Sequence, residues 1–279
     1  MPQPPLLRSL AAGLVAVGTS PLLIVSAFLG AFALWLIYSS TGVVTPGVMG
    51  QLESIPPMHT LLDVDFFGIG SRLLPAGGIL VLLGLIVLIR AGLLTLWLSI
   101  LIPRIEGHTP TDDEPRRPPF GADTFRLLQT LLAIEAGFLV VLFVLANVVA
   151  LLFGQLSIVF GPLLLMYFLL YVPVVAAAEA LGPVAAIRPA MRAARLRGPQ
   201  HALLVFGYVI GTLSLLLRRY SPDLAATPTL VTWSFALFTT FVHLSVLGTV
   251  VHRWLSVREP VLAVDENAPE SAAATSGLR

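Results

Sequence analysis

Glu135 and His243 are the ionisable residues of this chain that fit their surroundings least well. Each stands in a long apolar stretch, Glu135 within residues 124–153 and His243 within residues 228–254. If both lie near mid-membrane, a contact between them would form a buried hydrogen-bonded pair or a site that handles protons. In the simpler interpretation Glu135 is neutral and bonded to a neighbouring Ser or Thr, and His243 is a packing residue.

Arg90 is a third polar residue inside an apolar stretch, residues 73–101. In one straight helix, Arg90 would lie near the middle of the membrane, at a cost of about 2.5 to 3.5 kcal/mol, and would compete with His243 for Glu135. If the helix bends after Arg90, that residue reaches the interface, residues 92–105 lie along the surface and Trp97 sits at headgroup level. We favour the bend.

An Arg-rich segment lies between two Gly-Pro breaks, at residues 183–198. Helical projection places three of its arginines beside an apolar stripe, which is typical of a helix that lies in the membrane interface. This helix could only anchor the loop, could bind anionic lipid or a partner protein, or could gate an anionic substrate. The binding hypothesis assigns this role to Arg188, Arg192, Arg195 and Arg197.

Enzyme and metal signals are weak. The chain has no cysteine, and its five histidines include no HExxH motif and no pair at i, i+4, so metal-ligand spacing is missing. We therefore expect no catalytic residue, no metal and no cofactor. The sixteen basic residues nearly balance fifteen acidic ones, which argues against nucleic acid as a partner.

The elements that position these residues follow from composition. With 57% hydrophobic and 11% charged residues, the chain is too apolar for a water-soluble domain. We predict an all-α, polytopic membrane helix bundle, one domain over residues 1–258, with short interfacial helices on its cytoplasmic side. Its six expected transmembrane spans are residues 21–38, 73–101, 124–153, 156–181, 201–217 and 228–254.

Proline and glycine predict local features of these spans. Ser20 followed by Pro21 is typical of a helix start, and Pro173 should kink the fourth span because it removes a backbone hydrogen bond. Gly207 and Gly211 form a GxxxG motif, whose spacing lets helix backbones approach closely. We favour packing within this chain over dimerisation for that motif.

The arginines predict orientation. Six spans put both termini on one side with twelve arginines, against three on the other when Arg90 is left out. The positive-inside rule then makes both termini cytoplasmic, in the cell membrane. Residues 39–72 become an exoplasmic loop, residues 103–123 a cytoplasmic loop, and the Ala- and Ser-rich residues 259–279 a disordered cytoplasmic tail.

The motif from Glu179 to Gly198 resembles a bacterial and archaeal pattern. Glu179-Ala-Leu-Gly182, then Ala186-Ile187-Arg188, Met191-Arg192 and Leu196-Arg197-Gly198, is similar to the membrane domain beside some glycerophosphodiester phosphodiesterases and to stand-alone six-helix membrane proteins. Pro189 departs from the polar or basic residue usual there. The resemblance implies architecture only, because no long soluble segment exists to form the phosphodiesterase barrel.

The expected function is a non-catalytic membrane module that contacts the lipid bilayer, anionic lipids included, or a membrane-protein partner or second copy. One alternative is a small permease or transporter subunit that uses Glu135 and His243 beside a cavity opened at Pro173. The other is an intramembrane lipid enzyme, which lacks an evident nucleophile or metal set.

Overall fold

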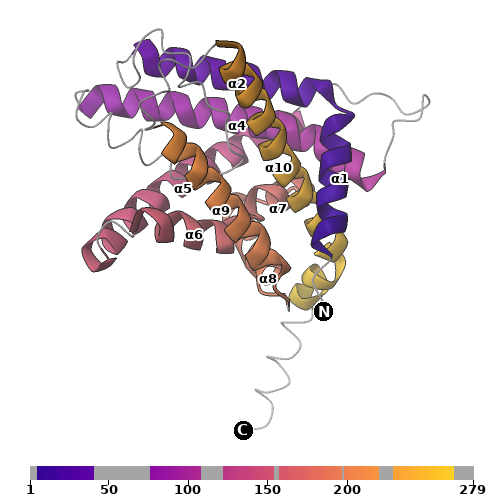
Figure 1. Ribbon diagram of the computed structural model, residues 1–279. Coiled ribbons are helices and arrows are strands. Elements are labelled where there is room, and N and C mark those ends of the chain that lie inside the picture. The colour runs from indigo at the N-terminus through magenta and orange to yellow at the C-terminus, as the bar shows by residue number, and fades with distance from the viewer. Residues whose placement is uncertain are drawn as a thin grey trace.

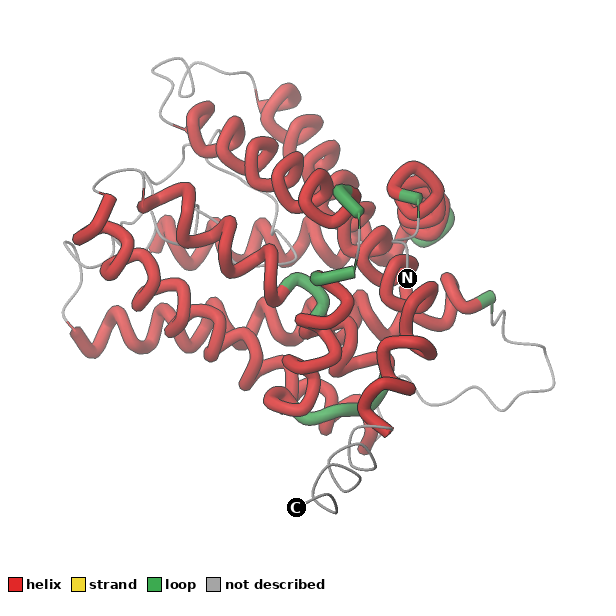
Figure 2. Tube along the Cα trace, turned by 90° about the horizontal axis from the view of Figure 1, so that it is seen from below, coloured by secondary structure: helices red, strands yellow, loops and turns green. Residues whose placement is uncertain are grey.

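The computed structural model describes residues 5–40, 76–107, 122–153, 157–196, 198–219 and 229–266, and within these ranges the chain is helical with no strand (Figures 1 and 2). The all-α prediction is therefore confirmed. Most of the two predicted long loops lies outside the described residues. The helices are α1 (Leu6–Gly18), α2 (Pro21–Ser40), α4 (Ala76–Glu106), α5 (Ala122–Phe153), α6 (Ser157–Leu169), α7 (Val172–Ala178), α8 (Pro183–Ala194), α9 (Gln200–Arg219) and α10 (Thr229–Glu266).

Three of the described helices are long and apolar enough to cross a membrane: Leu80–Glu106, Asp123–Leu142 and Leu230–Ala263. A fourth candidate forms if Leu6–Gly18 and Pro21–Ile37, which meet at 83°, are taken as one broken span. The segments expected as spans four and five appear, where described, as shorter apolar helices. The described residues thus contain three or four helices able to cross a membrane.

The corner between α1 and α2 is held by hydrogen bonds to backbone carbonyls. α2 begins at Pro21 as predicted, but the Ser20 hydroxyl donates to the Ala16 carbonyl at 2.8 Å instead of capping α2. Arg104, from the end of α4, donates to the Thr19 carbonyl at 2.8 Å. The sharp turn is therefore tied to a third helix.

α4 runs unbroken past Arg90, so the bend that we favoured there is wrong. Trp97 is buried against the neighbouring helices, and its Nε1 donates to the Ser26 hydroxyl of α2 at 3.2 Å. The physical reason is packing. The face of α4 that carries Arg90 and Trp97 is covered by α2 and α5, which lie alongside it (Figure 1).

Pro173 interrupts the apolar segment after α6, as expected. α6 ends at Leu169, and Pro173 lies in the first turn of α7. Because proline has no backbone N–H to donate, it is tolerated at a helix start and not in a continuous helix interior. The break leaves Tyr171 between the two helices, where its side chain is buried.

α10 is the central helix and contacts α1, α2, α4, α7 and α8. It crosses α1 at Gly13 and Gly248, so closely that a Cβ built on Gly13 would lie 2.5 Å from the Ser245 carbonyl oxygen. α10 also continues to Glu266, so residues 259–266, expected in the disordered tail, are helical. The buried Val257 and Val261 extend its packed face by one more turn.

Candidate functional sites

Arg90 and Glu135 form a buried ion pair between α4 and α5. Arg90 Nε donates to Glu135 Oε2 at 2.9 Å, and the two side chains are 3% and 1% exposed. Each lies on the packed face of its helix, Arg90 one turn from the buried Ile86 and Glu135 one turn from the buried Leu131. Opposite charges at this distance make each ionised form tolerable in an apolar interior. Arg90, which we considered as the alternative partner of Glu135, is therefore the residue that Glu135 bonds to.

His243 does not contact Glu135 in this ion pair; it bonds to Tyr208 of α9 instead. Tyr208 Oη and His243 Nδ1 are 2.7 Å apart, and both side chains are buried. The two rings meet edge to face, with centroids 5.5 Å apart. Glu135 and His243, which we weighed as a possible pair, therefore each bond to a different residue. Tyr208 was not expected as a site residue, although Tyr208 and Thr212 are polar residues one turn apart in an apolar helix.

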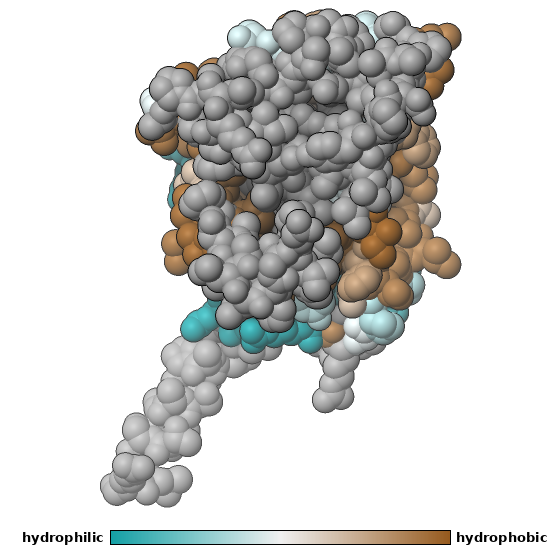
Figure 3. Space-filling model, turned by 60° about the vertical axis from the view of Figure 1, so that its left-hand side comes forward, coloured by the Kyte–Doolittle hydropathy of each residue, from teal (hydrophilic) through white to brown (hydrophobic). Residues whose placement is uncertain are grey.

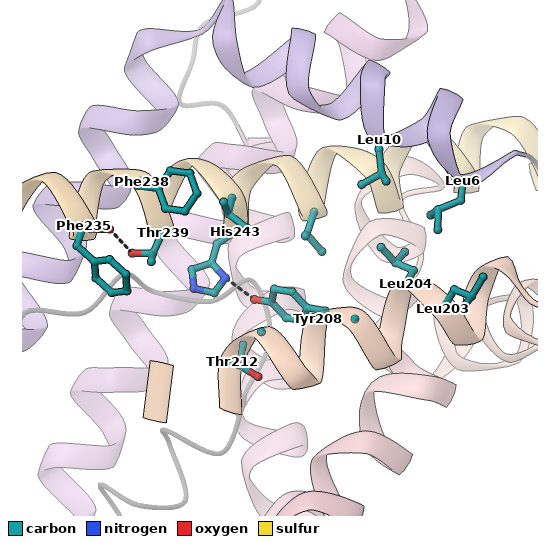
Figure 4. Close-up of a pocket in the computed structure, with 14 residues that line it drawn as sticks. Leu6, Leu10, Leu203, Leu204, Tyr208, Thr212, Phe235, Phe238, Thr239 and His243 are labelled. Atoms are coloured by element: carbon teal, nitrogen blue, oxygen red, sulfur yellow. Dashed lines mark hydrogen bonds between the residues drawn. The ribbon is translucent and has the colours of Figure 1, made fainter. Parts of the chain in front are cut away.

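A groove of about 570 Å³ lies beside the Tyr208–His243 pair and is lined by α1, α9 and α10 (Figure 4). Gly207 and Gly211 form part of its wall and are exposed, and a Cβ at either would meet nothing within 4 Å. Among the described residues, neither glycine makes the close helix contact that we favoured within this chain. That contact is made by Gly13 and Gly248, which lie far apart in the sequence.

Two of the four candidate arginines in and just after α8 are exposed at the surface. Arg188 and Arg195 are exposed and Arg192 is partly buried, while Arg197 lies outside the described residues. The opposite face of α8 is buried against the body of the protein through Ala186, Pro189, Ala190, Ala193 and Ala194. Pro189, noted as a departure from the family pattern, is thus one of the packing residues.

The apolar side chains that form one stripe of α8 are only partly exposed. Val184 is 78% exposed and Ile187 is 37% exposed, so they face outward beside the arginines, while Ala194 is buried. Arg195 lies over the Phe168 ring, with its guanidinium carbon 5.9 Å from the ring centroid. The outward face of α8 therefore combines guanidinium groups with exposed aliphatic side chains.

The turn into α8 is built from the Glu179-Ala-Leu-Gly motif. Ala180 has φ +50°, and the Leu181 N–H bonds to the Ala176 carbonyl at 3.1 Å, which is a helix ending of the Schellman type. Trp254 Nε1 of α10 donates to Glu179 Oε1 at 2.9 Å. Glu179, at the turn between α7 and α8, is therefore hydrogen-bonded to α10.

A second polar cluster, formed by Arg253, Tyr171 and His201, was not predicted. Arg253 is one of the twelve arginines that we assigned to the cytoplasmic side, and it is 1% exposed and donates from Nε to the Tyr171 hydroxyl at 3.0 Å. His201 stacks on Tyr171 with ring centroids 5.3 Å apart, and its Nε2 is 2.7 Å from the Tyr167 carbonyl. The sequence signal was weak because Arg253 and Tyr171 are 82 positions apart.

The described residues hold no group of three or more His, Cys, Asp or Glu side chains that could bind a metal. Comparison with known proteins finds no family model, no curated protein and no solved structure that matches the chain.

Proposed function

We propose that this chain is a non-catalytic integral membrane protein whose α8 face binds anionic lipid headgroups. The observation that carries the proposal is the way α8 is seated. Its alanine face is buried on the bundle, and Arg188 and Arg195 project outward together with Val184 and Ile187. A helix of this kind can insert aliphatic side chains among acyl chains while its guanidinium groups meet lipid phosphates.

The surface around α8 supports this reading. Figure 3 shows hydrophobic side surfaces above a hydrophilic band at the lower edge, the end at which α8 and the C-terminal part of α10 lie in Figure 1. A boundary between apolar and polar surface is what the edge of a bilayer requires. α8 would therefore lie at headgroup depth, where anionic phosphates are within reach.

The topology proposal is six spans in the cell membrane, formed by α2, α4, α5, α6 with α7, α9 and α10, with both termini cytoplasmic. It rests on the twelve-to-three distribution of arginines. Because the chain has no cysteine, Thr60→Cys and Thr275→Cys give clean labelling sites. We expect a membrane-impermeant maleimide to label residue 60 and spare residue 275 in intact cells. Labelling of both residues from one compartment contradicts the topology.

The kinship with the membrane domain of phosphodiesterases belongs to the same proposal and rests on the motif from Glu179 to Gly198. The alternative of a transporter with a Glu135 and His243 site loses support from the geometry, since Glu135 bonds to Arg90 and His243 lines a groove without it. The alternative of a lipid enzyme would require convergent reactive groups at that groove, and no described lining residue is acidic or cationic.

The test compares two double variants of the full chain in nanodiscs. Arg188→Gln with Arg195→Gln removes the two exposed arginines of α8; Arg8→Gln with Arg126→Gln removes two exposed arginines of α1 and α5. At about 1 kcal/mol for each arginine near the surface, the α8 variant should lose roughly 30-fold of its preference for anionic over zwitterionic lipid, measured by native mass spectrometry.

The control variant should keep most of that preference, and higher salt should weaken the wild-type preference because surface charges are screened. Equal losses in both double variants would mean that the whole surface charge, and not α8, selects the lipid. If the α8 variant keeps its lipid preference but loses a co-purified protein, the arginines serve a partner protein, and the lipid proposal fails.

A further inference from the structure

The groove between α9 and α10 exists because these helices are held apart. α9 packs mainly against α6 and also touches α1, while Tyr208 reaches across to His243 on α10 through one hydrogen bond. Exposed apolar side chains flank the opening, Leu203 on α9 and Phe238 on α10 among them. An apolar opening of this kind on a membrane helix bundle faces acyl chains rather than water.

The size of the groove suits one lipid chain. Its volume of about 570 Å³ falls within the roughly 300 to 1,000 Å³ that is usual for small-molecule sites. Its α9 wall runs from Leu203 to Thr212, nine steps of about 1.5 Å or roughly 14 Å. That length is close to half of the ~30 Å hydrocarbon core, which is the depth of one leaflet.

The two halves of the groove differ in polarity. Thr212, Thr239, Tyr208 and His243 supply its polar atoms, and the leucines line the other half. Figure 4 shows the two groups separated along the groove, with Phe235, Phe238, Thr239, His243, Tyr208 and Thr212 toward one end and Leu6, Leu10, Leu203 and Leu204 toward the other. A ligand that matches this lining has an apolar tail and one polar end.

His243 identifies the polar group of that ligand. Its Nδ1 is taken by Tyr208, whereas Nε2 is buried and has no hydrogen-bond partner among the described residues, although the side chain is only 3% exposed. Thr239 donates to the Phe235 carbonyl of its own helix at 3.0 Å, which leaves its oxygen able to accept. Nε2 has essentially no accessible surface in this conformation, so a ligand group bonds to it when the ring turns toward the groove. That bond adds affinity because a buried ring nitrogen without a partner is unfavourable.

We infer that this groove binds a neutral single-chain lipid with a hydroxyl end, its tail among the leucines and its hydroxyl at His243 Nε2. A hydroxyl both donates and accepts, so it suits His243 whichever ring nitrogen carries the proton. A phosphate or ammonium head does not fit, because none of the described lining residues is charged and an unpaired charge is costly to bury. The site is separate from the arginine face of α8.

The experiment uses the full-length protein in nanodiscs with a diazirine-tailed dodecanol as a photoreactive probe. Cross-linked peptides are mapped by mass spectrometry, and dodecanol, its methyl ether and dodecyl phosphate serve as competitors. We expect labelling to concentrate on the α9 and α10 walls of the groove and dodecanol to compete at least tenfold better than dodecyl phosphate. Labelling spread evenly over the apolar helices, or equal competition by the phosphate, overturns the inference.

Two glycine variants make the test independent of His243. Gly207→Leu projects into the groove, and Gly84→Leu lies on an exposed stretch of α4 away from it; a Cβ at either position meets nothing within 4 Å. Groove labelling should fall at least tenfold in Gly207→Leu and stay unchanged in Gly84→Leu. Labelling that survives Gly207→Leu contradicts the site.

His243→Phe then tests the hydroxyl contact itself. Dodecanol should compete about tenfold less well in this variant than in the wild type. A methyl ether that loses less shows that the hydroxyl donates to Nε2, and one that loses as much shows that it accepts from Nε2. Dodecanol that competes equally well in both proteins contradicts the contact with His243. If His243→Phe does not fold, the comparison of Gly207→Leu with Gly84→Leu still tests the groove.

Discussion

Two of the buried polar pairs that link helices in this protein differ in their surroundings. Arg90 and Glu135 join α4 and α5, which pack directly against each other, and both side chains are almost fully buried. Tyr208 and His243 join α9 and α10 across a groove, and His243 Nε2 has no partner among the described residues. The charged pair is enclosed because an exposed gap beside it would leave a charge in apolar surroundings, whereas a neutral pair can border an open site.

The largest effect should come from breaking the charged pair. Glu135→Gln leaves Arg90 as a buried charge without its counter-ion, so we expect a loss of about 3 to 5 kcal/mol of stability. The change is measured by thermal unfolding in detergent followed by circular dichroism. The double variant Arg90→Met with Glu135→Leu should recover most of the loss. A single variant as stable as the wild type would show that the ion pair is not needed to stabilise the α4–α5 contact.

A smaller loss of stability should distinguish the side of α10 that packs against α1 from the side that borders the groove. In Gly13→Ala the new Cβ would lie 2.5 Å from the Ser245 carbonyl oxygen and 2.7 Å from the Thr249 nitrogen, so α1 and α10 must move apart. Overpacking of this kind costs about 1 to 3 kcal/mol. Gly207→Ala on the groove side should cost nothing, because its Cβ has open space and alanine favours helix. Equal melting temperatures for both variants would contradict this difference.

The smallest effect should come from the neutral pair. Tyr208→Phe removes the hydroxyl bonded to His243 Nδ1 and should cost about 1 kcal/mol in the same unfolding assay. Tyr167→Phe is the matched control, a half-buried tyrosine for which no such side-chain bond to a histidine nitrogen is observed. A loss in Tyr208→Phe as large as that in Glu135→Gln would show that the two pairs are equivalent, and the comparison above would fail.

Local chemistry explains the predictions that the structure confirms. α2 begins at Pro21 and α8 at Pro183, and the apolar segment after α6 is broken at Pro173. Each depends on the fixed φ and the missing N–H of proline, which act within one helical turn. The helices themselves follow from long apolar runs whose backbone must satisfy its own hydrogen bonds in lipid.

Partners were harder to predict than elements. In α4 the apolar residues surround the helix, and in α10 polar residues such as Thr240 and Thr249 are themselves buried, so neither helix shows a polar face that would mark its exposed side. The choice between Arg90 and His243 as the partner of Glu135 therefore stayed open, and the bend at Arg90 was wrong. The same ambiguity applies to Gly207 and Gly211, since the spacing of glycines does not state which helix comes near.

The sequence by itself determined that this chain is an apolar, all-helical protein with helices able to cross a membrane, because composition and proline act without regard to distant residues. The tertiary structure decided that Arg90 meets Glu135, that Gly13 meets Gly248, and that Tyr208 and His243 border a groove. Those choices depend on which faces of near-uniform apolar helices come together. That selection is made by the shapes and few polar groups of residues far apart in the chain.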